Sequence, residues 1–126
     1  MSLILDSGAF IALERGNRSV WRKIEIARRA GILITTHGGI IAQVWRGGTR
    51  GQVQLTRALR MVKIVPLDDV LGRQAGMLLA HCGLSDAIDA ALVAMANHGD
   101  EIITSDPQDI QILVASSKRN LEIIPV

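Results

Sequence analysis

Five short, almost wholly apolar segments recur along the chain, and segments with helical spacing separate them. Apolar runs of this length are typical of strands that are buried on both faces. Parallel strands need long crossover connections, and right-handed crossovers place helices on both faces of a sheet. We therefore expect an α/β fold in three layers, with a mainly parallel sheet of four or five strands. The expected strands are 3–5, 32–34, 62–65, 101–104 and 121–124.

Capping residues mark where the helices begin, and glycines mark where several of them end. Asp68 precedes a helical pattern that closes on Gly83, and Asp106 followed by Pro107 is a strong helix start. The expected helices are 9–14, Asn17 or Ser19 to Arg29, Thr35 or Thr36 to Trp45, Thr49 or Arg50 to Leu59, 69–82, Ser85 or Asp86 to Asn97 or His98, and a last one from Asp106.

The length and composition indicate one compact domain, which we expect to span residues 1–126. The single cysteine excludes a disulfide framework and a zinc site built from cysteines. Nothing resembles a signal peptide, and no apolar run approaches the roughly 20 residues that cross a bilayer. We expect a soluble, cytoplasmic protein with no membrane partner.

Charge is divided unevenly along the chain, although the net formal charge is only +2. Residues 1–63 hold eleven Lys or Arg and three acids, whereas residues 64–126 hold three Lys or Arg and nine acids. This division suits a polyanion bound by the basic half, or a cation bound by the acidic half. Basic helix faces that only contact water would explain the charge equally well.

Several carboxylates are expected at the carboxyl ends of strands, where ligands of parallel sheets bind. Asp6 ends the first expected strand, and Asp106 follows the fourth. Asp86 and Asp89 share one face at the start of a helix between them. Carboxylates that converge repel one another unless a divalent cation neutralises them, and oxygen ligands suit Mg²⁺ or Mn²⁺. Each acid could instead be a helix cap or, like Asp109, a first-turn partner of a helix dipole.

Motifs of other functional classes are absent. The chain has no glycine-rich dinucleotide or P-loop motif and no GxSxG nucleophile elbow. A receiver-like phosphoacceptor domain would need a late lysine, but Lys118 lies in the wrong element. His37 is near a helix start and could face the cleft, although a surface position is expected. The helical spacing of Phe10, Trp21 and Trp45 beside aliphatic residues indicates core positions rather than base stacking.

Three segments of the sequence stand out: Leu-Asp-Ser-Gly-Ala-Phe-Ile-Ala-Leu at 5–13, Asp-Ala-Ala-Leu-Val-Ala-Met-Ala at 89–96 and Thr-Ser-Asp-Pro at 104–107. Together they resemble the PIN domain, close to the VapC toxins of bacterial toxin-antitoxin modules. Their order also matches the family, and the match extends over nearly the whole chain. The resemblance implies a PIN-like fold and a metal-dependent endoribonuclease that hydrolyses RNA phosphodiester bonds.

The resemblance further implies a set of partners and a site. The partners would be RNA, a cognate VapB-like antitoxin and a second copy of the chain in a homodimer. The cofactor would be Mg²⁺ or Mn²⁺. Residues that match the family's metal-binding carboxylates are Asp6, Asp89 and Asp106, with Asp86 as an additional acid, and those that match its orienting hydroxyls are Ser7 and Thr104.

One catalytic position departs from the family pattern. The family has Glu in the helix after the second strand, in an Ala-Glu-Val context, whereas this chain has Gln43. Glutamine can offer one carbonyl oxygen to a metal, but it supplies no negative charge and takes up no proton. The chain is either a natural variant that works through its aspartates or a nuclease silenced by a Glu→Gln change.

Two functional hypotheses remain open from the sequence. The first is a ribonuclease that is impaired by Gln43, with Arg46 and Arg50 contacting RNA phosphates. The second is a catalytically weak PIN domain that acts mainly by binding its antitoxin or RNA. In both, Arg46 and Arg50 could instead be solvent-facing helix charges.

Overall fold

The structure, a computed structural model that describes residues 1–126, contains five strands that all run parallel. They are β1 (Ser2–Leu5), β2 (Leu33–His37), β3 (Lys63–Val65), β4 (Glu101–Thr104) and β5 (Glu122–Pro125). They form one sheet in the order β3-β2-β1-β4-β5. At its centre, Leu3 of β1 pairs with Ile34 on one side and Glu101 on the other. The expected α/β fold with a parallel sheet is confirmed.

Seven α-helices and one short 3-10 helix connect the strands. No single helix is long and apolar enough to cross a membrane. One pair of helices, Asp69–Cys82 and Ala87–Ala94, reaches that length together but is bent by 109°. The helices are α1 (Ser7–Glu14), α2 (Arg18–Arg29), α3 (Gly38–Val44), the 3-10 helix η1 (Arg50–Gln52), α4 (Val53–Leu59), α5 (Asp69–Cys82), α6 (Ala87–Ala94) and α7 (Pro107–Ser117).

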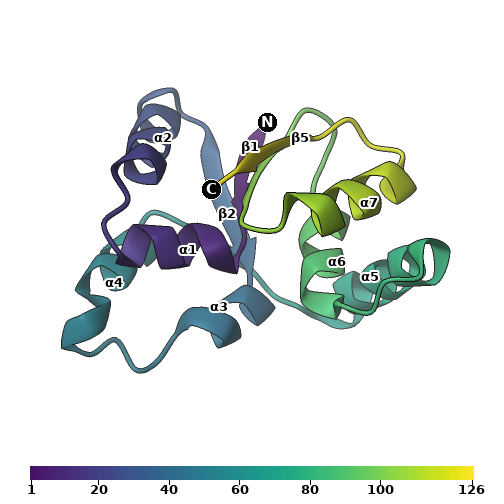
Figure 1. Cartoon of the computed structure of the whole chain (residues 1–126), viewed down its shortest axis with the longest axis horizontal. Coiled ribbons are helices and arrows are strands. Elements are labelled where there is room, and N and C mark those ends of the chain that lie inside the picture. The colour runs from purple at the N-terminus through teal and green to yellow at the C-terminus, as the bar shows by residue number, and fades with distance from the viewer.

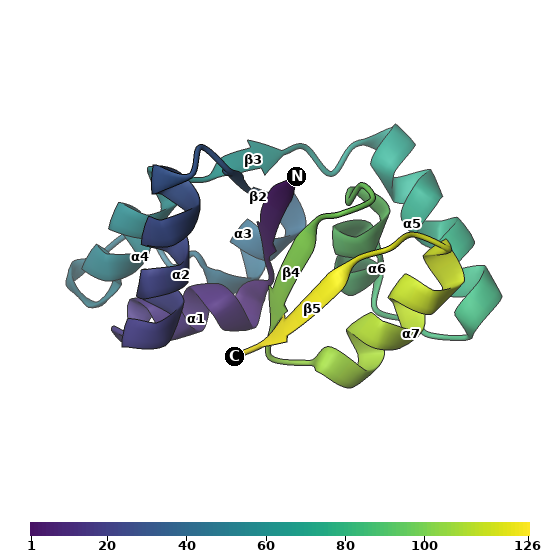
Figure 2. The ribbon, with the colours of Figure 1, turned by 90° about the horizontal axis from the view of Figure 1, so that it is seen from above.

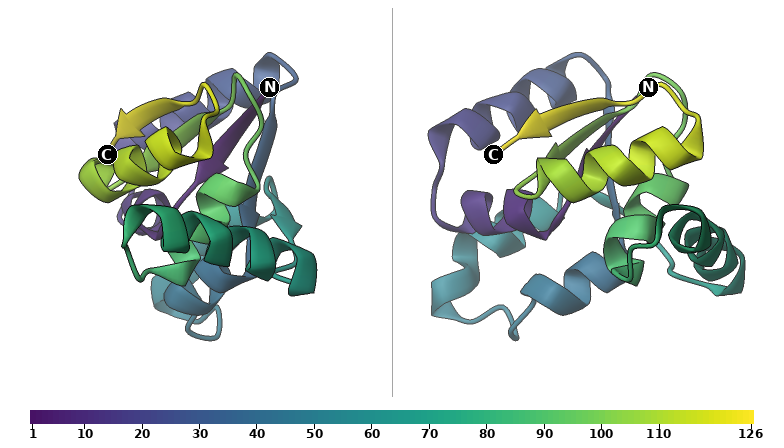
Figure 3. Two further views of the ribbon diagram at one scale, coloured as in Figure 1. Left: turned by 90° about the vertical axis from the view of Figure 1, so that its right-hand side faces the viewer. Right: turned by 45° about the vertical axis from the view of Figure 1, so that its right-hand side comes forward.

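The helices form two groups on opposite sides of the sheet. α1 contacts α2, α3 and α4, whereas α5, α6 and α7 contact one another. Figures 1 and 2 show the groups on either side of the strands, and Figure 3 shows α5 to α7 together. The chain moves from β1 to β3 in one direction and then crosses back to β4 and β5. Because right-handed crossovers in opposite directions cover opposite faces, this strand order produces the three layers.

Local capping signals predicted the starts of three helices correctly. The side chains of Asn17, Asp68 and Asp106 each accept a hydrogen bond from the backbone N–H three residues later, at the starts of α2, α5 and α7. Gly83 ends α5 in the left-handed conformation, with φ 72°. Glycine adopts this conformation without the steric cost of a Cβ atom, which explains why the helix stops there.

The second strand is longer than predicted, and the next helix starts later. We expected a helix from Thr35 or Thr36, but β2 continues to His37. Both threonines are β-branched, which favours a strand. Their hydroxyl groups also donate hydrogen bonds to the carbonyl oxygens of Lys63 and Leu5, at 3.0 and 2.8 Å. These cross-strand contacts extend β2 at the expense of the predicted helix.

Two further helix predictions were too long. α6 ends at Ala94 rather than at Asn97 or His98. The carboxylate of Asp100 accepts a hydrogen bond from the Asn97 N–H at 2.8 Å and closes a turn there. The helix expected to end at Leu59 is divided into η1 and α4.

The three aromatic side chains differ in burial. Phe10 is fully buried, and Trp21 is half-buried against the core cluster. Trp45 is 38% exposed, so its predicted core position was wrong. It directly follows α3 as the residue that ends the helix.

Candidate functional site

The carboxyl ends of β1 and β4 lie side by side, where the winding of the chain reverses. β1 leads into α1 on one side of the sheet, and β4 leads into α7 on the other. Open α/β sheets bind ligands at such a reversal point, because the helices diverge and leave a crevice there. Two of the expected site acids lie at these strand ends. Asp6 directly follows β1, and Asp106 follows β4 after Ser105.

Asp6 is held rigidly between the two strand ends. Its Oδ1 accepts the N–H of Ala9 at 2.8 Å, which caps α1, and its Oδ2 accepts the N–H of Ser105 at 3.1 Å. Its side chain is almost fully buried, at 3% exposure. Burial raises the pKa of Asp6 above its usual value, against hydrogen bonds from Thr104 and the backbone that lower it.

Asp86 and Asp89 open α6 close to this point. Asp86 is exposed and caps the helix, accepting the N–H groups of Ile88 and Asp89 at 3.0 and 3.1 Å. Asp89 is partly buried, and its side chain accepts no hydrogen bond and forms no ion pair. Burial raises the pKa of Asp89 to about 7, together with the negative charges of Asp86, Asp6 and Asp106, and of Asp109 beyond them. The structure thus brings the four expected acids near enough to repel one another.

Asp106 is exposed and caps α7. Its Oδ1 lies 3.4 Å from the N–H of Asp109, and its own N–H donates to the Thr104 hydroxyl at 2.9 Å. The two ion pairs of the structure, Arg29–Glu25 and Arg73–Asp69, involve none of the four site acids. No cationic side chain therefore compensates the charge of the cluster.

The donor set suits a hard divalent cation, although the side chains are not yet arranged around one. As they stand, no three His, Cys, Asp or Glu side chains form a group that could hold a metal ion. The set consists only of carboxylate oxygens, which Mg²⁺ and Mn²⁺ prefer. Asp86 and Asp106 are exposed, whereas Asp6 is buried. The chemistry of the residues therefore fits such an ion.

The two expected orienting hydroxyls lie in different settings. Thr104 is fully buried and bridges the site, because its hydroxyl contacts both Asp6 and the Asp106 N–H. Ser7 is the first residue of α1 and is half-buried, and its hydroxyl makes no hydrogen bond to the protein. Only Thr104 is therefore seen to orient a carboxylate.

Gln43 lies exposed near the end of α3, and its side chain forms no hydrogen bond. The guanidinium of Arg46 donates to the carbonyl oxygens of Gln43, Ala42 and Trp45, at 3.2, 3.2 and 2.6 Å. Arg46 thus caps the carboxyl end of α3. Arg50, the other predicted phosphate contact, is exposed at the start of η1 and has no partner.

The histidine that sequence reasoning placed at the surface is fully buried, so that prediction was wrong. His37 ends β2, and its Nδ1 accepts the N–H of Gly39 at 3.0 Å. Its Nε2 therefore carries the proton and donates to the carbonyl oxygen of Ile88 at 2.9 Å. Burial lowers the pKa of His37, which keeps the ring neutral. Ile88 directly precedes Asp89, so His37 ties β2 and α3 to the acidic turn of α6.

The pair Gly38-Gly39 is the signal in the sequence that marks this contact. A Cβ atom on Gly39 would lie 2.5 Å from the Ile88 Cδ1 and 2.8 Å from the His37 ring. Only glycine allows α3 to start so close to α6. Lys118, by contrast, ends α7 on the way into β5, at the opposite edge of the sheet from the acids. This placement disfavours a receiver-like site.

Comparisons with known proteins support the fold. No protein-family model matches the sequence, and no curated protein matches it. Among solved structures, this chain is similar to a chain in the "Crystal structure of VapBC2 from Rickettsia felis bound to a DNA fragment from their promoter". The TM-score is 0.72 at 14% sequence identity, over 98% of each chain. The likeness confirms the expected PIN-like fold, and at this identity it shows the fold alone.

Proposed function

We propose that this chain is a metal-dependent endoribonuclease of the VapC type, which hydrolyses RNA phosphodiester bonds. Asp89 carries the proposal. Asp6, Asp86 and Asp106 each cap a helix, so their positions have a structural explanation. Asp89 caps nothing and has no partner, and its burial, together with the nearby like charges, raises its pKa to about 7. A carboxylate kept where its ionised form is unfavourable is typical of a functional site.

The residues of the chain divide the work of the proposed site. Asp6, fixed by the N–H groups of Ala9 and Ser105, would provide an immobile oxygen ligand. Asp89 would face it from α6, and the exposed Asp86 and Asp106 would complete the set. A Mg²⁺ or Mn²⁺ ion bound there would neutralise the acids, activate water and stabilise the charge that develops on the phosphate. Thr104 would keep Asp6 and Asp106 in register.

A cleavage assay tests this function. The purified protein with Mn²⁺ and a structured RNA should cut the RNA, and Asp6→Asn should abolish the activity because the fixed ligand loses its charge. Asp69→Asn is the matched control, since Asp69 is an exposed acid paired with Arg73 on α5. Cleavage that persists in a chelator, or in Asp6→Asn, would refute the proposed mechanism.

Gln43 favours a second candidate, a catalytically weak domain that acts mainly by binding its antitoxin or RNA. Its side chain is exposed and uncharged, so it adds no negative charge that would attract a cation. If this position normally supplies a charge, Gln43→Glu should increase cleavage several-fold over the parent chain. Equal activity of the two proteins would mean that the position has no catalytic role here.

We also propose a protein antitoxin, a homodimer and a cytoplasmic location for this chain. The structural relative is a VapBC2 assembly bound to promoter DNA, which supports an antitoxin partner by analogy. Exposed apolar side chains on α5, Val70 and Met77, are available for a second copy. Light scattering of the purified protein should give twice the monomer mass, and Met77→Glu should return it to the monomer mass.

A further inference from the structure

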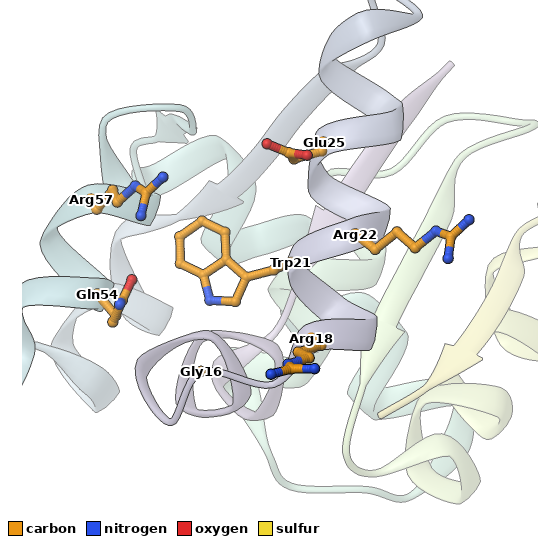
Figure 4. A pocket seen from close by; sticks show the side chains of 7 residues that line it. All are labelled: Gly16, Arg18, Trp21, Arg22, Glu25, Gln54 and Arg57. Atoms are coloured by element: carbon orange, nitrogen blue, oxygen red, sulfur yellow. The ribbon is translucent and has the colours of Figure 1, made fainter.

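A polar hollow of about 410 Å³ lies away from the acids, between α2, α4 and the end of α1. Figure 4 shows its side chains, with the Trp21 ring directed toward α4 between Gln54 and Arg57. Only one of the seven lining residues is hydrophobic. The lining residues are Gly16, Arg18, Trp21, Arg22, Glu25, Gln54 and Arg57.

The hollow carries a positive charge that the protein itself does not neutralise. Three arginines and one glutamate line it, and none of the three arginines forms an ion pair. In Figure 4 the Arg22 guanidinium points away from the Trp21 ring, so Arg18 and Arg57 are the arginines on the side of that ring. The glutamate, Glu25, lies 4.0 Å from Arg29. Guanidinium groups bind phosphate oxygens through paired, planar hydrogen bonds, so unpaired arginines around a hollow suit a phosphate ligand.

Part of this arrangement is fixed before any ligand binds. The indole N–H of Trp21 donates to the Leu13 carbonyl oxygen at 3.0 Å, which fixes the ring. The Arg57 guanidinium lies over that ring, 5.4 Å from its centroid. This cation–π contact orients Arg57 toward the space between α2 and α4. An arginine that is already ordered loses less conformational entropy when it binds an anion.

Helix α1 connects the hollow to the acidic site. Asp6 caps the start of α1, and Gly16 lies just beyond its end and lines the hollow. Eight residues at about 1.5 Å each make the helix about 12 Å long. A single strand of a few nucleotides spans a distance of that order. One strand can therefore reach both places.

We propose that this hollow binds backbone phosphates of an RNA strand whose scissile bond lies at the carboxylates. The choice of RNA as the ligand rests on the proposed function. The acids repel phosphates while they remain ionised, so affinity for RNA has to come from elsewhere on the surface. The hollow provides it, and Arg18 and Arg57, from its two walls, are the principal contacts. Arg46 is occupied with the carboxyl end of α3 and contributes less.

Binding of a labelled single-stranded RNA oligonucleotide, measured by fluorescence anisotropy in EDTA, tests this inference without any cleavage. The test variant is Arg18→Gln/Arg57→Gln. The control Arg73→Gln/Lys118→Gln removes the same charge from the opposite side of the sheet. Each phosphate contact contributes a salt slope of about −0.7, or about fivefold in affinity at 0.1 M salt. The test variant should therefore bind about 25-fold more weakly and lose about 1.4 from the slope.

The charge-preserving variant Arg18→Lys/Arg57→Lys should keep the salt slope of the parent and bind more tightly than the test variant, which separates loss of charge from loss of folding. Equal affinity of the test and control variants would overturn the inference. So would a test variant that loses affinity for a poly-glutamate peptide but not for RNA, since the hollow would then bind an acidic protein. If the parent chain cleaves RNA and the test variant binds RNA as tightly as the parent, only phosphate binding in the hollow would be refuted. Weakened binding by a chain that never cleaves RNA would refute only the proposed nuclease.

Discussion

At the level of single residues, the four aspartates of the candidate site have different roles. The alternative that each acid is a helix cap is correct for Asp6, Asp86 and Asp106. Capping does not exclude a second role, because a carboxylate has two oxygens and a cap uses few of their lone pairs. Asp89 is the exception, since no contact in the folded chain stabilises its charge. Its cost to stability in the ionised form can be measured.

We predict that stability falls as pH rises from about 4 to 7 because of Asp89. Folded Asp89 keeps its proton up to about pH 7, whereas the unfolded group has a pKa of 3.8. The folded state therefore binds more protons in this window, and the free energy of unfolding decreases through it. Asp89→Asn should be more stable than the parent at pH 8, by about 1–2 kcal/mol after allowing for the partial exposure of Asp89.

Urea unfolding in EDTA at pH 4 and pH 8 checks this prediction. The lowered pKa of His37 acts in the opposite direction below pH 6.5, but it is present in both proteins and cancels in their difference. The two proteins should be equally stable at pH 4. A variant that is no more stable than the parent at pH 8 would show that Asp89 is not held unfavourably.

A second prediction at the level of single residues concerns His37. Replacing it with alanine leaves the Ile88 carbonyl oxygen and the Gly39 N–H without their partners in a buried place. We expect His37→Ala to lower the free energy of unfolding by about 2–4 kcal/mol. His81→Ala, an exposed histidine on α5, is the control and should change it by less than about 0.5 kcal/mol. Similar losses in the two variants would argue against the bridge to α6.

At the level of helices and strands, the sequence predicted the features that depend on interactions within one helical turn. The caps Asn17, Asp68 and Asp106 and the stop at Gly83 act within one turn, so the sequence shows them directly. The strand ends also placed the acids, because parallel strands bring their carboxyl ends to one edge.

Contacts between distant segments could not be predicted in the same way. His37 reaches a carbonyl oxygen 51 residues away. Gln52 is buried, accepts the N–H groups of Arg46 and Gly48, and donates to the Val44 carbonyl oxygen, which closes the loop after α3. Neither residue belongs to a repeating pattern, and each depends on how separate elements pack. The arginines of the hollow likewise come together only when α2 and α4 both pack against α1.

The packing of α1 against the loop that follows β4 can be tested by mutation. A Cβ atom on Gly8 would lie 2.1 Å from the Ser105 Oγ and 2.3 Å from its Cβ. Gly8→Ala should displace the loop that carries Asp106 and destabilise the protein by about 1–3 kcal/mol. Adding Ser105→Gly removes both clashing atoms and should restore most of the loss. A double variant no better than Gly8→Ala alone, in thermal unfolding, would contradict this packing.

At the scale of the whole molecule, the division of charge along the chain becomes a division in space. The acidic half contributes three of the four site acids, and β1 brings Asp6 to them from the basic half. The hollow between α2 and α4 is built entirely from the basic half. The proposed cation and the proposed RNA would therefore bind to different regions of one molecule.

Calorimetric titration with Mn²⁺ at pH 7 tests whether these acids hold a divalent cation. We predict saturable binding, with a heat that depends on the buffer because Asp89 releases its proton as the ion enters. Asp89→Asn should abolish this binding, and Asp69→Asn should leave it unchanged. No saturable binding to the parent chain, or equal binding by Asp89→Asn, would contradict the account.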